Sequence, residues 1–394
     1  MRISPIFTLT AAVLACSACG GDGKPGGAPD APAGGGLDGP VQVDVNAAPA
    51  TKLSAYRFFT WDARTTAFTF NDRVVPYDMN TPLFSDDALK QRAIYIPPGA
   101  AATYDPESAF DFPVGSVIIK TFWFADDLRT PATSNPRLVE TRLLVRHAAG
   151  WVPLPYIWDA DQKDATFSPG GETRTIAFTD ATGAPRTANY LIPARNQCET
   201  CHAHQEVVNG PIDLVLIGVK ARHLNRTYDY GGTTGAVNQL DHLAALGMLH
   251  GAPAAVDAPK AYDFRPIEAN GAAAVPAGEL DLATRSYLDI NCGHCHNPHG
   301  VNGVTSQLFL DHTNTDAFHL GVCKRPGSAG VGNGGLVYDI VPGSPDQSIL
   351  YFRDSTTQVG AIMPLLERSI THQNGSALIK DWIAAMPPLV CDPP

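Results

Sequence analysis

The stretch "RSYLDINCGHCHNPHG", residues 285–300, concentrates two cysteines and three histidines in residues 292–300. It contains the pattern Cys-x-x-Cys-His, formed by Cys292, Cys295 and His296. A segment with helical periodicity leads directly into the motif. The chemistry that the motif serves therefore decides both the architecture of the C-terminal part and the function of the chain.

A second copy of the pattern lies in "NQCETCHAH", residues 196–204, and consists of Cys198, Cys201 and His202. Cys-x-x-Cys-His is the attachment sequence of c-type haem. The two thiols add across the vinyl groups of the porphyrin, and the histidine that follows binds the iron as its proximal ligand. We therefore predict two covalently bound haem c groups, one on each motif.

Two other chemistries also use paired cysteines. A structural zinc site joins two Cys-x-x-Cys knuckles, but its knuckles are usually closer in sequence, and zinc leaves the histidine after each second cysteine unexplained. A redox-active dithiol needs a βαβ context, and neither motif has one. Haem is the interpretation that accounts for every residue of both motifs.

The N-terminus predicts export and a lipid anchor. Residues 1–16, "MRISPIFTLTAAVLAC", combine one basic residue with an apolar stretch too short to span a bilayer. This resembles a bacterial lipoprotein signal within residues 1–19, with cleavage before Cys16 or, as the competing site, Cys19. An ordinary secretory signal with incidental cysteines is the alternative. We expect the protein in the periplasm or on the cell surface, anchored by lipid to the outer membrane.

The charge of the chain limits its partners. The net charge is −11 and the isoelectric point is near 5.5, which disfavours nucleic acid and anionic lipid as partners. Electron-transfer proteins of the periplasm or cell surface are the expected partners, with a membrane contacted only through the anchor. The 36 glycines and 33 prolines predict many turns and long loops.

Composition divides the mature chain into four parts and predicts an α+β, multidomain fold. Residues 20–50 are rich in Gly, Pro and Ala and suggest a flexible tether. Residues 51–190 suggest an antiparallel β domain. Residues 191–270 and 271–394 suggest two haem-binding segments built mainly of helices and loops, the second of which is a separate domain.

Short β-branched and aromatic runs, separated by turn residues, predict the strands of the β domain. They are "GSVIIKTFWF" (115–124), "RLVETRLLVRH" (137–147), "GWVPLPYIW" (150–158) and "TRTIAFT" (173–179). Within this domain only "SDDALKQRA" (85–93) suggests a helix. Apolar residues at helical spacing predict three further helices, within residues 238–249, 277–292 and 374–386.

The C-terminal part resembles a small class I cytochrome c domain. A helix, the haem motif, a long loop, the Met-Pro of "GAIMPLLERS" (360–369) and a closing helix follow one another in the order typical of that class. The resemblance implies that the first and last helices cross and that Met363 supplies the sixth ligand of the second iron. Met386, also followed by proline, is the competing residue.

The sixth ligand of the first iron is open at this level. His223 and Met248 are the candidates downstream of the first motif, and an unoccupied sixth position is the third possibility. His204 is too close to His202 to reach the opposite face of a porphyrin.

The chain from about residue 52 to its end resembles a family of poorly characterised two-haem c-type cytochromes, often lipoproteins of Gram-negative bacteria, for which no reaction is established. In the position where that family usually has a small polar residue, this chain has His223. The matching segments are "VVPYDMNTPLFSDDALKQRAIYIPPG", "FDFPVGSVIIKTF", "VETRLLV", "NQCETCH", "ARHLNRTYDY", "NQL", "RSYLDINCGHCHNPHG", "LGVCKRPGSAGVG", "VPGSPDQSILYFR" and "IMPLL".

Two cysteines, Cys323 and Cys391, belong to neither motif. In an oxidising compartment we expect them to form a disulfide. The function that these observations favour is electron transfer by an exported dihaem cytochrome. The alternatives are a peroxidase- or oxidase-like enzyme that uses an open first haem, and a haem-carrying sensor or binding module.

Overall fold

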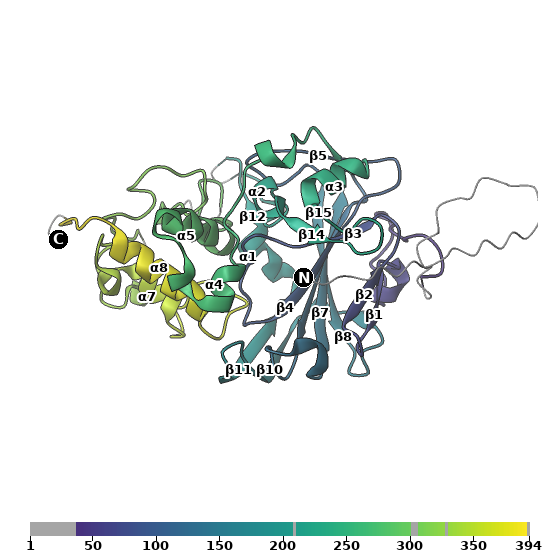
Figure 1. Ribbon diagram of the computed structural model, residues 1–394, viewed down its shortest axis with the longest axis horizontal. Coiled ribbons are helices and arrows are strands. Elements are labelled where there is room, and N and C mark those ends of the chain that lie inside the picture. The colour runs from purple at the N-terminus through teal and green to yellow at the C-terminus, as the bar shows by residue number, and fades with distance from the viewer. Residues whose placement is uncertain (1–36, 208–209, 301–305, 328–329, 392–394) are drawn as a thin grey trace, which may run out of the picture. The chain divides into compact units, whose positions relative to one another are not determined.

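A six-stranded antiparallel sheet forms the centre of the N-terminal half in the computed structural model (Figure 1). Its strand order is β3-β4-β6-β7-β8-β9, and all neighbouring strands run antiparallel. The strands are β3 (Val74–Tyr77), β4 (Leu89–Tyr95), β6 (Val117–Phe124), β7 (Arg137–His147), β8 (Gly150–Trp158) and β9 (Ala165–Phe167).

The structure describes residues 37–207, 210–300, 306–327 and 330–391. The predicted signal segment, with Cys16 and Cys19, and the first part of the predicted tether lie outside the described residues. From residue 37 onwards the chain packs along the sheet, because Val41, Val43 and Val45 contact one of its apolar clusters.

The longest pair of strands lies where the sequence predicts it. β7 and β8 occupy residues 137–147 and 150–158, and they pair from Glu140 with Ile157 to His147 with Gly150. Gly150, with φ of 133°, allows the tight connection between them because this backbone conformation is strained for residues with a side chain. The β-branched and aromatic runs between turn residues predict both strands, and this prediction is confirmed.

The predicted helix at 85–93 is wrong, because residues Leu89–Tyr95 form strand β4. Helix propensity favours this segment, but tertiary packing overrides it. Ala93 and Ile94 are both fully buried and lie in clusters on opposite faces of the sheet, and Ile94 pairs with Ile118 of β6.

Five two-stranded ribbons accompany the sheet. They are β1 (Phe59–Asp62) with β2 (Ala67–Phe70), β10 (Glu172–Thr179) with β11 (Pro185–Ile192), β12 (Ala203–His204) with β13 (Asp213–Leu214), β14 (Thr227–Asp229) with β15 (Ala236–Asn238), and β5 (Ala102–Thr103) with β16 (Leu249–His250). The last pair is parallel and connects the β-rich part to the segment that follows the first motif. One apolar cluster spans the same junction, from Ile94 and Ile118 to Leu224 and Leu240.

The helices are short and most lie in the C-terminal third of the chain (Figure 1). They are α1 (Glu199–His202), α2 (Ala221–Leu224), α3 (Gln239–Ala245), α4 (Arg265–Asn270), α5 (Leu280–Leu288), α7 (Ile349–Ser355) and α8 (Gln373–Ala385). The three predicted helices are confirmed as α3, α5 and α8, whereas α1, α2, α4 and α7 were not predicted. No helix within the described residues is long and apolar enough to cross a bilayer.

Helices α5 and α8 pack against each other through a shared apolar cluster that includes Leu288, Leu378 and Ile383. Gly375 makes the close approach possible, since a Cβ there would lie 2.3 Å from the hydroxyl oxygen of Tyr287. The two helices that the class I resemblance predicts to meet are therefore in contact.

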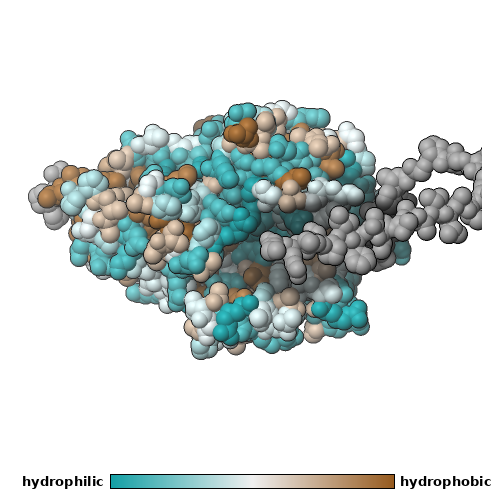
Figure 2. Space-filling view, viewed as in Figure 1, coloured by the Kyte–Doolittle hydropathy of each residue, from teal (hydrophilic) through white to brown (hydrophobic). Residues whose placement is uncertain are grey.

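The described chain from residue 37 onwards belongs to one compact unit, and its mixed helices and antiparallel sheets confirm the α+β class. Cys323 and Cys391, which the sequence predicts to pair, form a disulfide. On the face drawn in Figure 2, hydrophobic residues lie in small groups among hydrophilic ones.

Candidate functional site

The two Cys-x-x-Cys-His motifs, 95 positions apart at their closest contact, lie against each other. The Cys295 thiol donates a hydrogen bond to the carbonyl oxygen of Thr200 at 3.1 Å. The ligand atoms of Cys201, His294 and Cys295 lie within 4.8 Å of one another. The second cysteine of each motif therefore faces that of the other.

The contact continues on the C-terminal side of both motifs. The rings of His204 and His299 stack with their centroids 4.9 Å apart. The backbone N–H of Gln205 donates to the carbonyl of His299 at 2.8 Å, and His204 forms an isolated antiparallel bridge with Gly300. The two motifs therefore form one unit in the structure, although the sequence analysis placed them in two separate segments.

The second motif begins where α5 widens into one π-helical turn, Asp289–Gly293. This turn carries Cys292. Gly293 is required here, because a Cβ would lie 2.8 Å from the Cα of Asp311. The backbone N–H of His296 donates to the carbonyl of Cys292 at 2.9 Å, so both thiols and the histidine are held on one short coiled segment.

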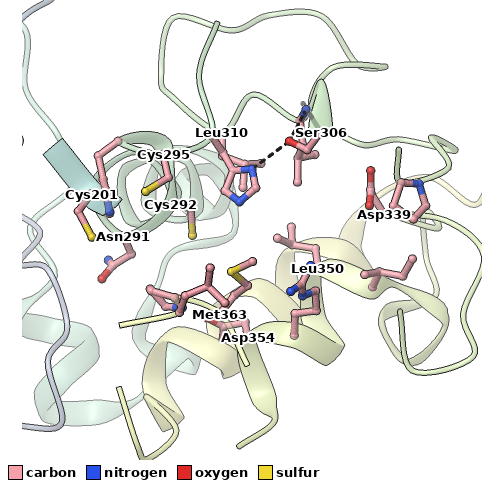
Figure 3. A pocket seen from close by; sticks show the side chains of 18 of the residues that line it. Cys201, Asn291, Cys292, Cys295, Ser306, Leu310, Asp339, Leu350, Asp354 and Met363 are labelled. Atoms are coloured by element: carbon pink, nitrogen blue, oxygen red, sulfur yellow. Dashed lines mark hydrogen bonds between the residues drawn. The ribbon is translucent and has the colours of Figure 1, made fainter. Parts of the chain in front are cut away.

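A cavity of about 330 Å³ lies beside the second motif and is lined by Cys292, Cys295, His296 and Met363. The volume falls within the range usual for cofactor sites. Figure 3 shows the sulfur of Met363 directed into this cavity, with Cys292 and Cys295 on the neighbouring coiled segment. The loop between α7 and α8 holds Met363 through two hydrogen bonds. The N–H of Met363 donates to the carbonyl of Arg353, and the Arg368 side chain donates to the carbonyl of Met363.

The first motif lines a second, narrower cavity of about 120 Å³ with Cys198, Cys201 and His202. Its opposite wall is the central sheet, from which Ile118 and Leu144 project. The volume is below the usual range for cofactor sites. A macrocycle bound here requires the lining side chains to move apart.

A hydrogen bond sets the tautomer of His202 that a metal ligand requires. Its Nδ1 donates to the carbonyl oxygen of Val215 at 2.7 Å, which leaves Nε2 as the unprotonated nitrogen. Burial lowers the pKa of His202 to about 4, so the ring is neutral at pH 7. Burial lowers the pKa of His296 to about 4 as well, and its Nδ1 lies 3.4 Å from the hydroxyl of Ser306.

The thiols of Cys198, Cys201 and Cys292 are not activated nucleophiles. Burial raises the pKa of Cys198 to about 11 and raises that of Cys292 further. A hydrogen bond to Cys295, followed by burial, raises the pKa of Cys201 well above its usual value. Reactive dithiols have lowered pKa values, so these properties disfavour a redox dithiol.

A row of basic side chains crosses the sheet wall of the first cavity. Arg92, Lys120 and Arg142 are direct neighbours on β4, β6 and β7, and all three line the cavity. Arg92 contacts Asp78 at 3.2 Å, and Arg142 contacts Glu140 at 2.5 Å.

The sequence did not identify this row. Basic residues at alternate positions within the apolar runs "ALKQRA" and "VIIKTF" were the available signal. Such a pattern usually marks a solvated sheet face.

The other predicted ligands lie elsewhere. His223 is fully buried, with its Nε2 3.0 Å from the Asp289 carboxylate. Met248 is buried in the cluster between the sheet and α3. Neither His223 nor Met248 is among the described residues that line the first cavity. Met386 packs at the end of α8 and does not belong to the described lining of the second cavity.

Comparison with known proteins gives no match: no family model, no curated protein and no solved structure is similar to this chain.

Proposed function

We propose that this chain is a c-type cytochrome that carries two covalently bound haem groups and transfers electrons between periplasmic or cell-surface proteins. The observation that carries the proposal is the contact between the two Cys-x-x-Cys-His motifs, each of which faces its own cavity. Haem iron bound at these sites supplies reversible one-electron chemistry.

The residues present fit the group. Cys198 and Cys201 would form the thioethers of the first haem, and His202 offers a neutral Nε2 to its iron. In the first cavity Nη2 of Arg92 is buried and has no hydrogen-bond partner among the described residues, as expected where an anionic group is missing. Cys292 and Cys295 would hold the second haem.

The two axial ligands that we propose for the second haem lie on different sides of its cavity. His296 and Met363 line the same cavity from the motif and from the loop before α8. A thioether opposite a histidine raises the reduction potential, which suits an electron carrier. The proposal for Met363 rests on this placement together with the order of elements in the chain.

The contact between Cys201 and Cys295 supports electron transfer in series. The attachment residues of the two haems would be neighbours, so the porphyrin edges attached to them would lie close together. A short distance between two redox groups is what a carrier needs in order to pass electrons from one partner to another.

We also propose that the protein is an exported lipoprotein of the two-haem family that its motifs resemble. Covalent haem and the Cys323–Cys391 disulfide both suit an oxidising compartment. The proposed anchor at Cys16 or Cys19 would hold the protein on the outer membrane, within reach of redox partners.

A second candidate is a metal centre at the junction of the motifs. Cys201, His294 and Cys295 bring two sulfurs and one ring nitrogen within 4.8 Å, which is a possible three-ligand set for zinc. It leaves Cys198, Cys292 and both motif histidines without a metal-binding role, so haem accounts for more of the site.

Optical and EPR spectra of the purified protein, with iron, zinc and haem counted per chain, distinguish these functions. Two low-spin, six-coordinate haems support the electron carrier. A high-spin first haem that binds added ligands favours the enzyme or the sensor. A protein that contains zinc and no haem would refute the cytochrome.

A further inference from the structure

Lys120 is a half-buried cation without a direct partner among the described residues. It lies between Arg92 and Arg142 in register, and like charges directly opposite each other destabilise a sheet. Its Nζ forms no hydrogen bond or ion pair with any described residue and lies 4.6 Å from the centre of the Phe122 ring. Burial lowers its pKa to about 7, and the charges of Glu367 and Glu140 oppose this shift only in part.

The neighbouring acids do not remove this shortage. Asp78 is shared by Arg92 and Arg226. Glu140 and Glu367 both contact Arg142. Glu367 attracts Lys120 only through space. The Nη2 of Arg92, whose side chain is 4% exposed, has no partner among the described residues.

We propose that Arg92, Lys120 and Arg142 form a carboxylate-binding site in the first cavity, and that its occupants are the propionate groups of the first haem. The inference rests on the proposed function. The same cavity holds the attachment cysteines of the first motif, and propionates project from the porphyrin edge away from the vinyl groups that cysteines bind. Guanidinium and ammonium groups on a sheet wall match two carboxylates on that edge.

The test compares the two haem potentials in Lys120→Met with those of the unchanged holo-protein. Loss of a cation beside the first haem should lower the potential of that haem and leave the second unchanged. Lys120→Arg should restore the potential because it keeps the charge. Lys90→Met is the matched control, since Lys90 lies on the same sheet and near the same ring but outside the described lining.

Three outcomes overturn the inference. If both potentials are unchanged in Lys120→Met, the row does not contact the haem. If succinate binds to the holo-protein and the binding is lost in Lys120→Met while both potentials stay unchanged, the site serves a soluble carboxylate. If the unchanged protein carries no covalent haem, the proposed function fails first, and the haem count reveals this separately.

A different observation concerns the iron of the first haem. Met79 lies in the segment after β3, is 4% exposed and lines the cavity that holds His202. Its sulfur packs on the loop that also orients His202, since a Cβ on Gly218 would lie 3.0 Å from Sδ and Cε of Met79. Val215, three residues earlier, accepts the hydrogen bond of His202.

A polar network fixes the backbone around Met79. Arg226 donates to the carbonyl of Met79 at 2.6 Å. The side chain of Asn80 donates to the carbonyls of Arg222 and Asn225 at 3.0 and 3.1 Å. These bonds connect "DMN" with "ARHLNR", two segments that are remote in sequence, and hold the thioether in one place.

We infer that Met79 is the sixth ligand of the first iron, given the proposed function. Tyr77 and Lys120 line the same cavity, but Tyr77 offers a harder oxygen donor, and Lys120 lies in the basic row between Arg92 and Arg142 that is proposed to bind the propionates. His294 also lines it, yet lies beside the Cys201 thiol at the attachment edge. A thioether is a soft, uncharged iron ligand that suits an apolar cavity.

The near-infrared sulfur-to-iron band of the oxidised protein tests this assignment. Met79→Leu should lower its intensity by about half, because one of two sulfur ligands is lost, and should make one haem high-spin. Met248→Leu, a buried methionine outside the described lining, is the control and should change neither signal. Met79→His should keep both haems low-spin and lower one potential.

An unchanged band in Met79→Leu, with two haems still attached, would refute Met79 as the ligand. Loss of the band in Met248→Leu would do the same. Absence of attached haem in the unchanged protein would instead refute the cytochrome itself.

Discussion

The two cavities are built in different ways. The second takes its thiols, His296 and Met363 from one continuous stretch that folds around α5 and α8. The first takes its thiols and His202 from one motif but its opposite wall from strands far away in sequence. The comparison teaches that a Cys-x-x-Cys-His motif is local, whereas the other residues that line its cavity can come from anywhere in the fold.

The same contrast explains what the sequence could predict. The strands at 137–147 and 150–158 follow from β-branched and aromatic runs, and the helices α5 and α8 follow from helical periodicity. Met363 could be nominated because its position follows chain order. Met79 and Lys120 could not, because their placement depends on strand pairing and on the packing of residues 216–226 against the sheet.

One error has the same cause. The helix predicted at 85–93 followed local propensity, while the real strand β4 is selected by its partners β3 and β6. The contact between the two motifs also has no local signature, since it joins Thr200 to Cys295 across 95 positions.

The largest effect expected at the second cavity comes from Met363→His. Replacing the thioether with an imidazole should abolish the sulfur-to-iron band of one haem and lower its potential, because methionine favours ferrous iron more than histidine does. The first haem should keep its potential. Spectroelectrochemistry measures both.

Met386→Leu is the control for that change. It should alter stability slightly and leave the spectrum unchanged, since Met386 packs at the end of α8. If the band keeps its full intensity in Met363→His and loses intensity in Met386→Leu, the loop before α8 does not supply the ligand.

Removal of the Cys323–Cys391 disulfide tests whether the parts around the two cavities differ in stability. Cys323→Ser with Cys391→Ser should lower the free energy of unfolding by about 4 kcal/mol in the chain-entropy model, with sequence separation 68. Because the bond closes only the C-terminal part, urea unfolding should expose the second cavity first. If both cavities became exposed at the same urea concentration, this expectation would be wrong.

We expect Lys120, on the central sheet, to make the free energy of unfolding depend on pH. Burial holds its folded pKa near 7, below the usual 10.5, with Arg92 and Arg142 beside it and Glu367 opposing the shift. The unfolded chain therefore binds more protons between these values, so stability should rise with pH from about 7 to about 10.5. In haem-free protein the rise attributable to Lys120 over this pH range should be about 4 kcal/mol.

Chemical unfolding of haem-free Lys120→Met at pH 7 and pH 10 isolates this contribution. The variant should be more stable than the unchanged chain at pH 7, and the difference should shrink at pH 10. A difference that is the same at both pH values would show that Lys120 is not buried as a cation.

The smallest effect concerns the packing of α5 on α8. Gly375→Ala places a Cβ against Tyr287 and should cost about 1–3 kcal/mol, as overpacking usually does. Gly278→Ala is the matched control, because a Cβ there meets nothing within 4 Å. Thermal unfolding of both variants checks the result, and equal stability would contradict the close approach of the two helices.

The most direct test of the central claim is the intact mass of the exported protein after denaturation, measured for the unchanged chain, Cys198→Ala and Cys292→Ala. Two haems on one chain predict two covalently retained haem groups in the unchanged protein, and each substitution should impair the attachment of one haem only. A mass without haem in the unchanged protein, or haem that separates on denaturation, would contradict the claim.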